Sequence, residues 1–282
     1  MSHYQHWRSA MPPLDLPGGF AVAHFKTRFV HDLTTQTVVF SRTELKHIFA
    51  DRILDEQAIG YWHDKPMYLL ELDNEELPDS KFDWITARHF MLQGEIALVK
   101  LLGFASQVGT WAREHRYCGS CGRSMQSSLA HRMRYCQPCG IQQYPRIAPC
   151  MIVLVSRGDE ILLARAPRFV PGMYSTLAGF AEPGETIEEC VHREVMEETC
   201  LKIHQLKYIT SQNWPFPHSM MLGFHAEYLS GDIVPELDEI EDAQWFNIQQ
   251  LPPLPMQGSI ARYLIDLYIY QRLGGSEPVL PN

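Results

Sequence analysis

Over residues 1–85, apolar side chains come in short runs separated by polar, turn-forming stretches, a pattern typical of β-strands joined by tight loops. The runs rich in strand-forming residues cover 20–25, 37–40 and 67–72. Turn signals such as Pro12-Pro13 and Pro17-Gly18-Gly19 stand outside these runs. This part of the chain predicts a small α/β or β-rich domain.

Residues 87–114 change to a spacing near three and four, which is typical of an α-helix with an apolar stripe. The apolar positions are Phe90, Met91, Ile96, Ala97, Leu101, Leu102, Ala105, Val108, Trp111 and Ala112. We expect a helix here that leads to a cysteine-rich segment and bends near Gly94 or Gly103.

From residue 147 the pattern returns to strands. Runs at 148–156 and 160–164 flank the polar turn 157–159, which predicts a β-hairpin. A glycine-bounded loop and a charged helix follow, then strands near 206–211 and 221–228 and a last helix over 259–273. We find no internal repeat in the sequence and no low-complexity segment.

Composition narrows the class of protein. The 282 residues are 45% hydrophobic and 20% charged, which is globular usage and enough for two domains. No apolar window of about 18 residues and no apolar signal region occur, so we expect a soluble, cytoplasmic protein without a membrane partner. The formal charge of −9 argues against non-specific nucleic-acid binding by the whole molecule.

One segment departs from this acidic balance. Residues 113–146 carry six arginines and a single glutamate. A run of this kind usually forms a solvated face, and the alternative is a contact with nucleic acid.

Four of the seven cysteines form two Cys-x-x-Cys pairs, Cys118/Cys121 and Cys136/Cys139. In a reducing compartment this spacing favours metal ligation over disulfides, and two tight knuckles can supply four thiolates to one tetrahedral Zn²⁺. Four thiolates leave no open position for water, so we expect a structural ion. The remaining Cys150, Cys190 and Cys200 are expected to be small buried thiols without chemistry.

The strongest chemical signal is a glutamate-rich helix after the glycine-bounded loop. Thr186 and Glu189 form a capping box that marks its start. Glu194 and Glu198 then lie about 40° apart around the helix, with Glu197 about 60° to the other side of Glu194. Like charges on one helical face repel one another, so this face indicates either a bound divalent cation or a merely solvated acidic surface.

The complete spacing resembles the Nudix box of the Nudix hydrolases. Gly179, Glu185 and Arg193 stand at its defined positions, followed by the three glutamates. The departure is Cys200, where the family has glycine at a position expected to need positive φ.

The resemblance implies an α/β fold, a Nudix α/β/α sandwich, with Mg²⁺ or Mn²⁺ as the catalytic cation. It implies that Glu194 and Glu198 are the main metal ligands and that Glu197 is a ligand or acid–base partner. Glu185 and Arg193 would pair to orient the loop. The backbone carbonyl of Ala178 and a glutamate outside the box, for which Glu239 is the candidate, would complete the metal site.

A second motif narrows the substrate. Residues 211–219 resemble the SQPWPFPxS array of the NADH pyrophosphatase branch, with Asn213 in place of a proline. The order of N-terminal domain, four-cysteine ribbon and Nudix domain is also similar to that branch. The substrate-binding residues so implied are Gln212, Asn213, Trp214, Pro215, Phe216, Pro217, His218 and Ser219 of the array, together with Tyr144, Phe180, Ala261 and Arg88.

The resemblance implies three parts: an N-terminal mixed α/β domain at 1–114, a four-cysteine zinc ribbon at 115–144 and a Nudix catalytic domain at 145–282. It implies a homodimer that hydrolyses the diphosphate bridge of NADH or NAD to nicotinamide mononucleotide and AMP, and that removes NAD caps from RNA. The alternatives are a Nudix hydrolase of ADP-ribose or another nucleoside diphosphate derivative, and a nucleotide-sensing protein that binds nucleic acid through the ribbon.

Overall fold

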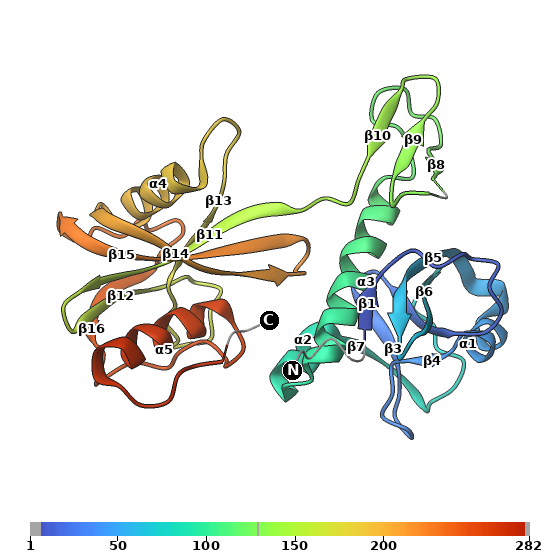
Figure 1. Ribbon diagram of the computed structural model, residues 1–282, viewed down its shortest axis with the longest axis horizontal. Coiled ribbons are helices and arrows are strands. Elements are labelled where there is room, and N and C mark those ends of the chain that lie inside the picture. Colours follow the sequence, from blue (N-terminus) through green and yellow to red (C-terminus); the bar gives the residue numbers. More distant parts are fainter. Residues whose placement is uncertain (1–6, 129, 280–282) are drawn as a thin grey trace. The chain divides into compact units, whose positions relative to one another are not determined.

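A computed structural model describes residues 7–128 and 130–279 of the chain. The chain forms two compact units, Met1–Arg146 and Ile147–Asn282 (Figure 1). Within the described residues, no helix combines the length and the apolar character needed to cross a membrane.

The described part of the first unit is built on a seven-stranded sheet in the order β1-β5-β6-β2-β3-β7, with β4 beside β2. The strands are β1 (Trp7–Ser9), β2 (Phe20–Phe25), β3 (Arg28–Asp32), β4 (Phe40–Ser41), β5 (Ile53–Trp62), β6 (Lys65–Leu72) and β7 (Phe82–Thr86). The helices are α1 (Arg42–Ile48), the 3-10 turn η2 (Ala50–Arg52), α2 (Ala87–Gln93) and α3 (Ile96–Glu114).

Two expectations for this unit need correction. The run at 37–40 contributes only the short β4, because the Thr37 hydroxyl bonds with both the amide and the carbonyl of Val39 and bends the chain. The helix expected over 87–114 is two helices. Gly94 ends α2 with φ of 76°, a left-handed conformation that glycine adopts without strain, whereas Gly103 lies inside α3.

A three-stranded ribbon follows α3 in the same unit (Figure 1). Its strands are β8 (Gln126–Ser127), β9 (Arg134–Cys136) and β10 (Ile141–Gln143). The apolar core is small, with Cys118, Met125 and Cys136 buried against the half-buried Ile141. So small an apolar core cannot stabilise the ribbon by itself, and further interactions are needed.

Two arginines provide part of this stabilisation through hydrogen bonds and an ion pair. Arg132 donates to the carbonyl oxygens of Ala10 at 3.0 Å and Ala58 at 3.2 Å. Arg134 pairs with the Asp55 carboxylate at 3.1 Å. The expectation of a solvated face is therefore wrong for Arg132 and Arg134, because both guanidinium groups bind partners within the unit.

The second unit contains a six-stranded sheet in the order β14-β15-β11-β12-β16, with β13 beside β11, among the residues that the structure describes. Its strands are β11 (Ala148–Arg157), β12 (Glu160–Arg165), β13 (Leu177–Phe180), β14 (Lys202–Trp214), β15 (Ser219–Ser230) and β16 (Asp242–Asn247). The hairpin expected from 148–164 is confirmed as β11 and β12, which pair antiparallel across the turn.

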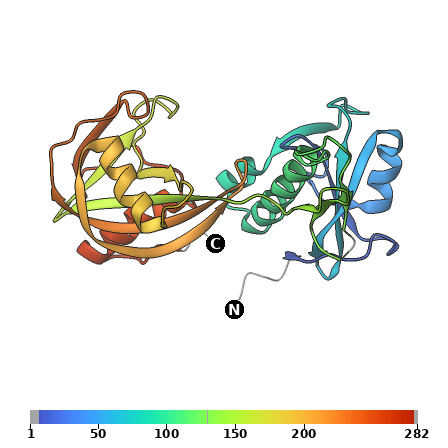
Figure 2. The ribbon, with the colours of Figure 1, turned by 90° about the horizontal axis from the view of Figure 1, so that it is seen from above.

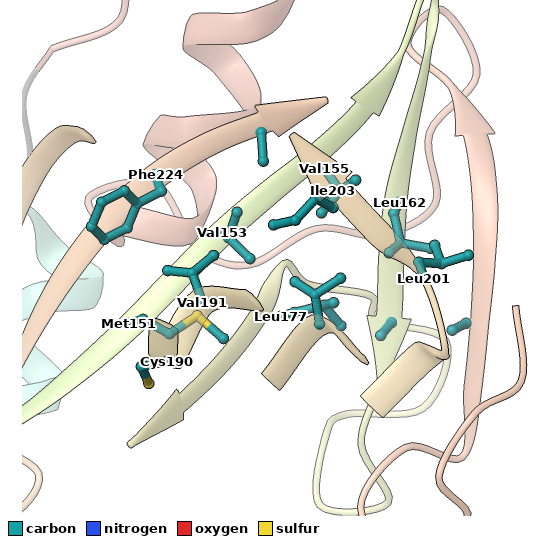
Figure 3. Packing of buried hydrophobic residues seen from close by; sticks show 14 of the residues in the cluster. Met151, Val153, Val155, Leu162, Leu177, Cys190, Val191, Leu201, Ile203 and Phe224 are labelled. Atoms are coloured by element: carbon teal, nitrogen blue, oxygen red, sulfur yellow. The ribbon is translucent and has the colours of Figure 1, made fainter. Parts of the chain in front are cut away.

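Two helices cover the sheet, α4 (Ile187–Thr199) on one face and α5 (Ile260–Leu273) on the other (Figures 1 and 2). Strand β11 divides its side chains between them with the two-residue period of a strand. Met151, Val153 and Val155 pack toward Val191 of α4 (Figure 3), in a cluster that also contains Val195. Cys150, Ile152 and Leu154 pack with Leu264 and Ile265 of α5. The expected α/β/α sandwich is confirmed.

Replacing Arg134 with alanine should lower the free energy of unfolding by about 1–3 kcal/mol, because the partly buried Asp55 carboxylate loses its cationic partner. Chemical denaturation of the full chain measures this change. The matched control is Arg123→Ala, since Arg123 is an exposed ribbon arginine, and its effect should stay within about 0.5 kcal/mol. Equal effects of the two substitutions would contradict the fastening role of Arg134.

Candidate functional site

Helix α4 has a well-defined start and end. The Thr186 hydroxyl accepts from the amide of Glu189, and the Glu189 carboxylate accepts from the amide of Thr186, which confirms the capping box. At the other end Cys200 has φ of 59°, as expected for this position, although its β-carbon makes that conformation cost about 1 kcal/mol relative to glycine. The Cys200 side chain is exposed rather than buried as expected.

Two of the three box glutamates are buried between α4 and the sheet. Glu194 is 9% exposed and Glu198 is 4% exposed, whereas the Glu197 side chain is 52% exposed. Gly179 of β13 makes room for the first carboxylate, because a β-carbon there would lie 1.9 Å from the carboxyl carbon of Glu194. The glycine of the motif is thus required by a close approach of strand and carboxylate.

The environment of Glu198 is unfavourable for a carboxylate alone. Its Oε2 atom is buried without a hydrogen-bond partner among the described residues. Burial, with the charges of Glu194 and Glu239, raises the pKa of the Glu198 carboxyl to about 8. Burial also raises the pKa of Glu194. A cation beside these oxygens would offset both effects.

Arg193 organises the other side of the cluster. It donates to Glu185 at 2.6 Å, to Glu194 at 3.0 Å and to Glu197 at 2.9 Å. A further bond of 3.0 Å reaches the carbonyl oxygen of Phe180. The Arg193 guanidinium, with the amide of Glu182, lowers the pKa of Glu185 to about 2. The pairing of Glu185 with Arg193 that the sequence predicts is present in the structure.

Glu239 lies on an exposed loop, residues 231–241, that is bonded to the end of α4. The amide of Val234 donates to the carbonyl of Thr199 at 3.0 Å, and that of Glu236 to the carbonyl of Glu198 at 3.2 Å. This loop brings the charge of Glu239 close enough to raise the pKa of Glu198. The charge of Glu239 thus acts on Glu194 and Glu198, although no sequence motif marks this residue.

The donor set fits a hard divalent cation, because it consists of carboxylate oxygens with one buried oxygen unpartnered among the described residues. Among the described residues, the four ribbon cysteines are the only group of three or more His, Cys, Asp or Glu side chains whose ligand atoms converge, within 4.8 Å of one another. Ala178, the residue before Gly179 in β13, pairs in register with Ile152 of β11.

The array at 211–219 forms the tip of a β-hairpin, since β14 ends at Trp214 and β15 begins at Ser219. Gln212 is buried, and its amide both donates to the carbonyl of Gly258 and accepts from the amide of Ile260, each at 2.8 Å. It therefore holds the start of α5 against β14, a role that the sequence did not indicate. The rings of Trp214 and Phe216 meet edge to face with centroids 5.2 Å apart.

The remaining predicted positions are divided between the two units. Phe180 ends β13 with 56% of its surface exposed, and Ala261 is buried in the first turn of α5. Tyr144 and Arg88 belong to the first unit, where the Tyr144 hydroxyl donates to the side chain of Gln142. The second unit thus carries the box, Glu239 and the array, and the contributions of Tyr144 and Arg88 stay predictions.

One basic residue near the cluster has no motif to mark it. Arg168, on the segment between β12 and β13, is the group that most strongly lowers the pKa of Glu198. Its position in a loop outside the box gives the sequence no signal for its role.

The four cysteines of the ribbon lie with their sulfur atoms within 4.8 Å of one another. Each knuckle closes with a backbone bond, from Gly122 to the carbonyl of Cys118 at 2.8 Å and from Gly140 to that of Cys136 at 2.9 Å. Backbone amides directed at the sulfur lower the pKa of Cys118 to about 7. The cluster is thus able to bind a tetrahedral ion such as Zn²⁺, as the spacing predicts.

Comparison with known protein families separates the chain into two matched regions. The sequence model of the NUDIX domain matches residues 145–268. A second one, described as NADH pyrophosphatase-like rudimentary NUDIX domain, matches residues 17–111.

Curated relatives match nearly the whole chain. A protein named NAD-capped RNA hydrolase NudC from Pseudomonas fluorescens strain Pf-5 is 56% identical over 99% of this chain and 99% of its own length. One of the same name from Pseudomonas aeruginosa strain PAO1 is 54% identical, with 98% of each chain covered. A solved NUDIX hydrolase from Nitrosomonas europaea aligns with a TM-score of 0.49 and 18% identity, covering 58% of this chain and 97% of that one.

Elemental analysis of the purified full chain should find about one zinc ion for each chain, because the four thiolates form a closed tetrahedral set. Cys139→Ser should release most of this zinc and lower the melting temperature. Cys200→Ser, which changes an exposed cysteine outside the cluster, should leave the zinc content unchanged. A native protein without zinc whose Cys121 and Cys139 react freely with a thiol reagent would contradict the assignment.

Proposed function

Because the chain belongs to the Nudix hydrolases, in the group that carries an NADH pyrophosphatase-like domain before the NUDIX domain, we propose that it hydrolyses the diphosphate bridge of NADH and NAD. The products are nicotinamide mononucleotide and AMP. Removal of NAD caps from RNA breaks the same bond, and the name of these relatives, NAD-capped RNA hydrolase, supports it. The observation that carries the proposal is the burial of two box glutamates on α4, Glu194 against Gly179 and Glu198 one turn further along the helix.

We propose that Glu194 and Glu198 hold Mg²⁺ or Mn²⁺ with the carbonyl of Ala178 and the Glu239 carboxylate. Such an ion, when bound, polarises a phosphoryl oxygen and favours ionisation of a water molecule. The water oxygen forms a bond to one bridge phosphorus, the bond from that phosphorus to the bridging oxygen breaks, and two monophosphates leave.

The protein side chains orient this reaction. Arg193 fixes Glu194 and the loop that carries Glu185, so that the buried carboxylates keep one geometry before substrate arrives. Glu197 is more exposed than its two neighbours and can serve as a further ligand or take up the proton of the attacking water.

Substrate selection is assigned to the surfaces around this cluster. Phe180 offers an exposed ring to stack on nicotinamide, directly after the glycine that touches Glu194. The hairpin from Gln212 to Ser219 forms the second surface, and Ala261 follows the helix start that Gln212 holds. Tyr144 and Arg88 of the first unit are proposed to complete substrate binding, as the family resemblance implies.

The remaining assignments follow from the same family. The ribbon holds a structural Zn²⁺, which is supported by the four convergent thiols. Paired cysteines that bind zinc instead of forming disulfides are typical of a reducing compartment, so we place the protein in the cytoplasm. Assembly as a homodimer is proposed from the resemblance to the NADH pyrophosphatase branch.

The test compares hydrolysis of NADH, NAD, NAD-capped RNA and ADP-ribose by the wild-type chain and by Glu198→Gln at saturating Mg²⁺ or Mn²⁺. An amide can neither balance the charge of the ion nor accept a proton, so kcat should fall about 10²- to 10⁴-fold. The control is Glu188→Gln, which changes an exposed glutamate in the first turn of the same helix and should leave kcat unchanged.

Near-normal turnover by Glu198→Gln would contradict the catalytic assignment. Wild-type hydrolysis of ADP-ribose with a higher kcat/KM than NADH, NAD and capped RNA would keep the Nudix chemistry and overturn the proposed substrates.

A further inference from the structure

A row of four side chains crosses the sheet of the second unit on the face that α5 covers. Gln212 of β14 is in register with Met221 of β15, Met221 with Cys150 of β11, and Cys150 with Phe180 of β13. Residues in register project from the same face of a sheet, so the four side chains lie side by side. The exposed ring of Phe180 ends the row on one side, and the buried Gln212 ends it on the other.

The first turn of α5 packs on this row. Ile260 and Ala261 belong to the same buried cluster as Met221, and Trp214 of the array packs against that cluster. Gly223 of β15 permits the close approach of the helix, because a β-carbon there would lie 2.9 Å from Cδ1 of Ile260. The start of α5 is therefore in contact with the sheet and with the array.

Gln212 holds this turn with both ends of its amide group. Its Nε2 atom donates to the carbonyl oxygen of Gly258, and its Oε1 atom accepts from the amide of Ile260, each at 2.8 Å. Ser259 lies between these two residues and caps the helix, since its hydroxyl accepts from the amide of Arg262 at 3.3 Å. The side chain of Gln212 thus binds the backbone on both sides of the helix cap.

One backbone donor of the turn is left for a ligand. Gln212 and the Ser259 hydroxyl bind two of the first amides of α5, and the Ser259 carbonyl oxygen binds that of Tyr263 at 3.0 Å. The amide of Ala261 has no hydrogen-bond partner among the described residues. Ala261 is also the residue of this turn that the family resemblance assigns to the substrate. The direction of its amide depends on how the turn lies on the sheet.

Gln212 itself lies too far from the exposed end of the row to touch a ring bound there. Only 5% of its surface is exposed. Three strand spacings, about 14 Å in all, separate it from Phe180. A ring that stacks on Phe180 does not reach Gln212, so an effect of Gln212 on that ring has to pass through α5.

We propose that Gln212 is a positioning residue of the substrate site, which holds the first turn of α5 on the sheet and so directs the Ala261 amide toward the dinucleotide. This inference rests on the proposed function. It refines the role of Gln212 from contact with the substrate to support of the residue that contacts it.

The first test compares hydrolysis of NADH by the full chain and by Gln212→Met, which keeps the size of the side chain and removes both hydrogen bonds. KM should rise about 5- to 100-fold, in line with the loss of two hydrogen bonds, while kcat changes little because the box glutamates are untouched. The matched control is Gln205→Met, the same substitution at an exposed position of β14, and it should change neither constant.

A second variant separates positioning from direct contact. Ser259→Ala loosens the same turn without altering Gln212, so it should also raise KM, by about 2- to 10-fold. A raised KM in Gln212→Met beside an unchanged KM in Ser259→Ala would mean that Gln212 touches the substrate itself, and the inference would be wrong. A lower melting temperature of Gln212→Met with unchanged KM would leave Gln212 a structural role only, which also overturns it.

Two further readouts do not depend on turnover. Hydrogen exchange over residues 258–263 should be faster in Gln212→Met than in wild type and unchanged in Gln205→Met. Calorimetric titration with NAD, without added divalent cation so that NAD is not hydrolysed, should give a Kd weakened by about the same factor as KM.

These readouts distinguish failure of the inference from failure of the proposed function. If wild type hydrolyses NADH and Gln212→Met matches it in KM, the inference is overturned and the proposed function stands. If wild type binds NAD but hydrolyses no dinucleotide, the proposed function fails and the two Kd values decide the inference. If wild type neither hydrolyses nor binds a dinucleotide, both fail.

Discussion

The burial of two carboxylates between a helix and a sheet is the constraint on which the catalytic unit depends. Glu194 and Glu198 lie where a globular core would place apolar side chains, and one oxygen of Glu198 lacks a partner within the described residues. Such burial is costly unless charge and hydrogen bonds offset it. Gly179 provides the space and Arg193 provides part of the charge. The uncompensated remainder is what makes this position suited to a divalent cation.

The first unit also places acidic side chains close together, and there arginines balance their charge. His24 of β2 is in register with Glu71 of β6, which is in register with Asp55 of β5, so three titratable residues cross the sheet side by side. Here arginines take the place that the cation would hold in the second unit. Arg116 pairs with Glu71 at 2.9 Å, and Arg134 pairs with Asp55. Buried and partly buried acidic residues of the first unit thus bind arginines of the ribbon.

Local patterns were predictable from the sequence, and long-range contacts were not. The capping box, the positive φ of Cys200 and the cysteine knuckles depend on residues a few positions apart, and each appears as expected. The hydrogen bonds of Gln212 and the pairing of Arg134 with Asp55 join residues far apart in the sequence, so no local pattern could reveal them. The motif marked Gly179 as required, and only the structure gives the reason, which is its approach to Glu194.

The proposed function requires a divalent cation that offsets the negative charge of the buried Glu194 and Glu198 carboxylates. Thermal unfolding of the full chain, with and without Mg²⁺ or Mn²⁺, tests it directly in the wild type and in Glu198→Gln. Without metal the amide variant should melt higher at pH 7, because it removes the cost of burying a carboxyl group whose pKa is raised to about 8. With metal at about 100 times Kd the wild type should gain about 2.7 kcal/mol and the variant much less. A wild type that melts higher than the variant without metal, and that gains no stability when metal is added, would contradict the account.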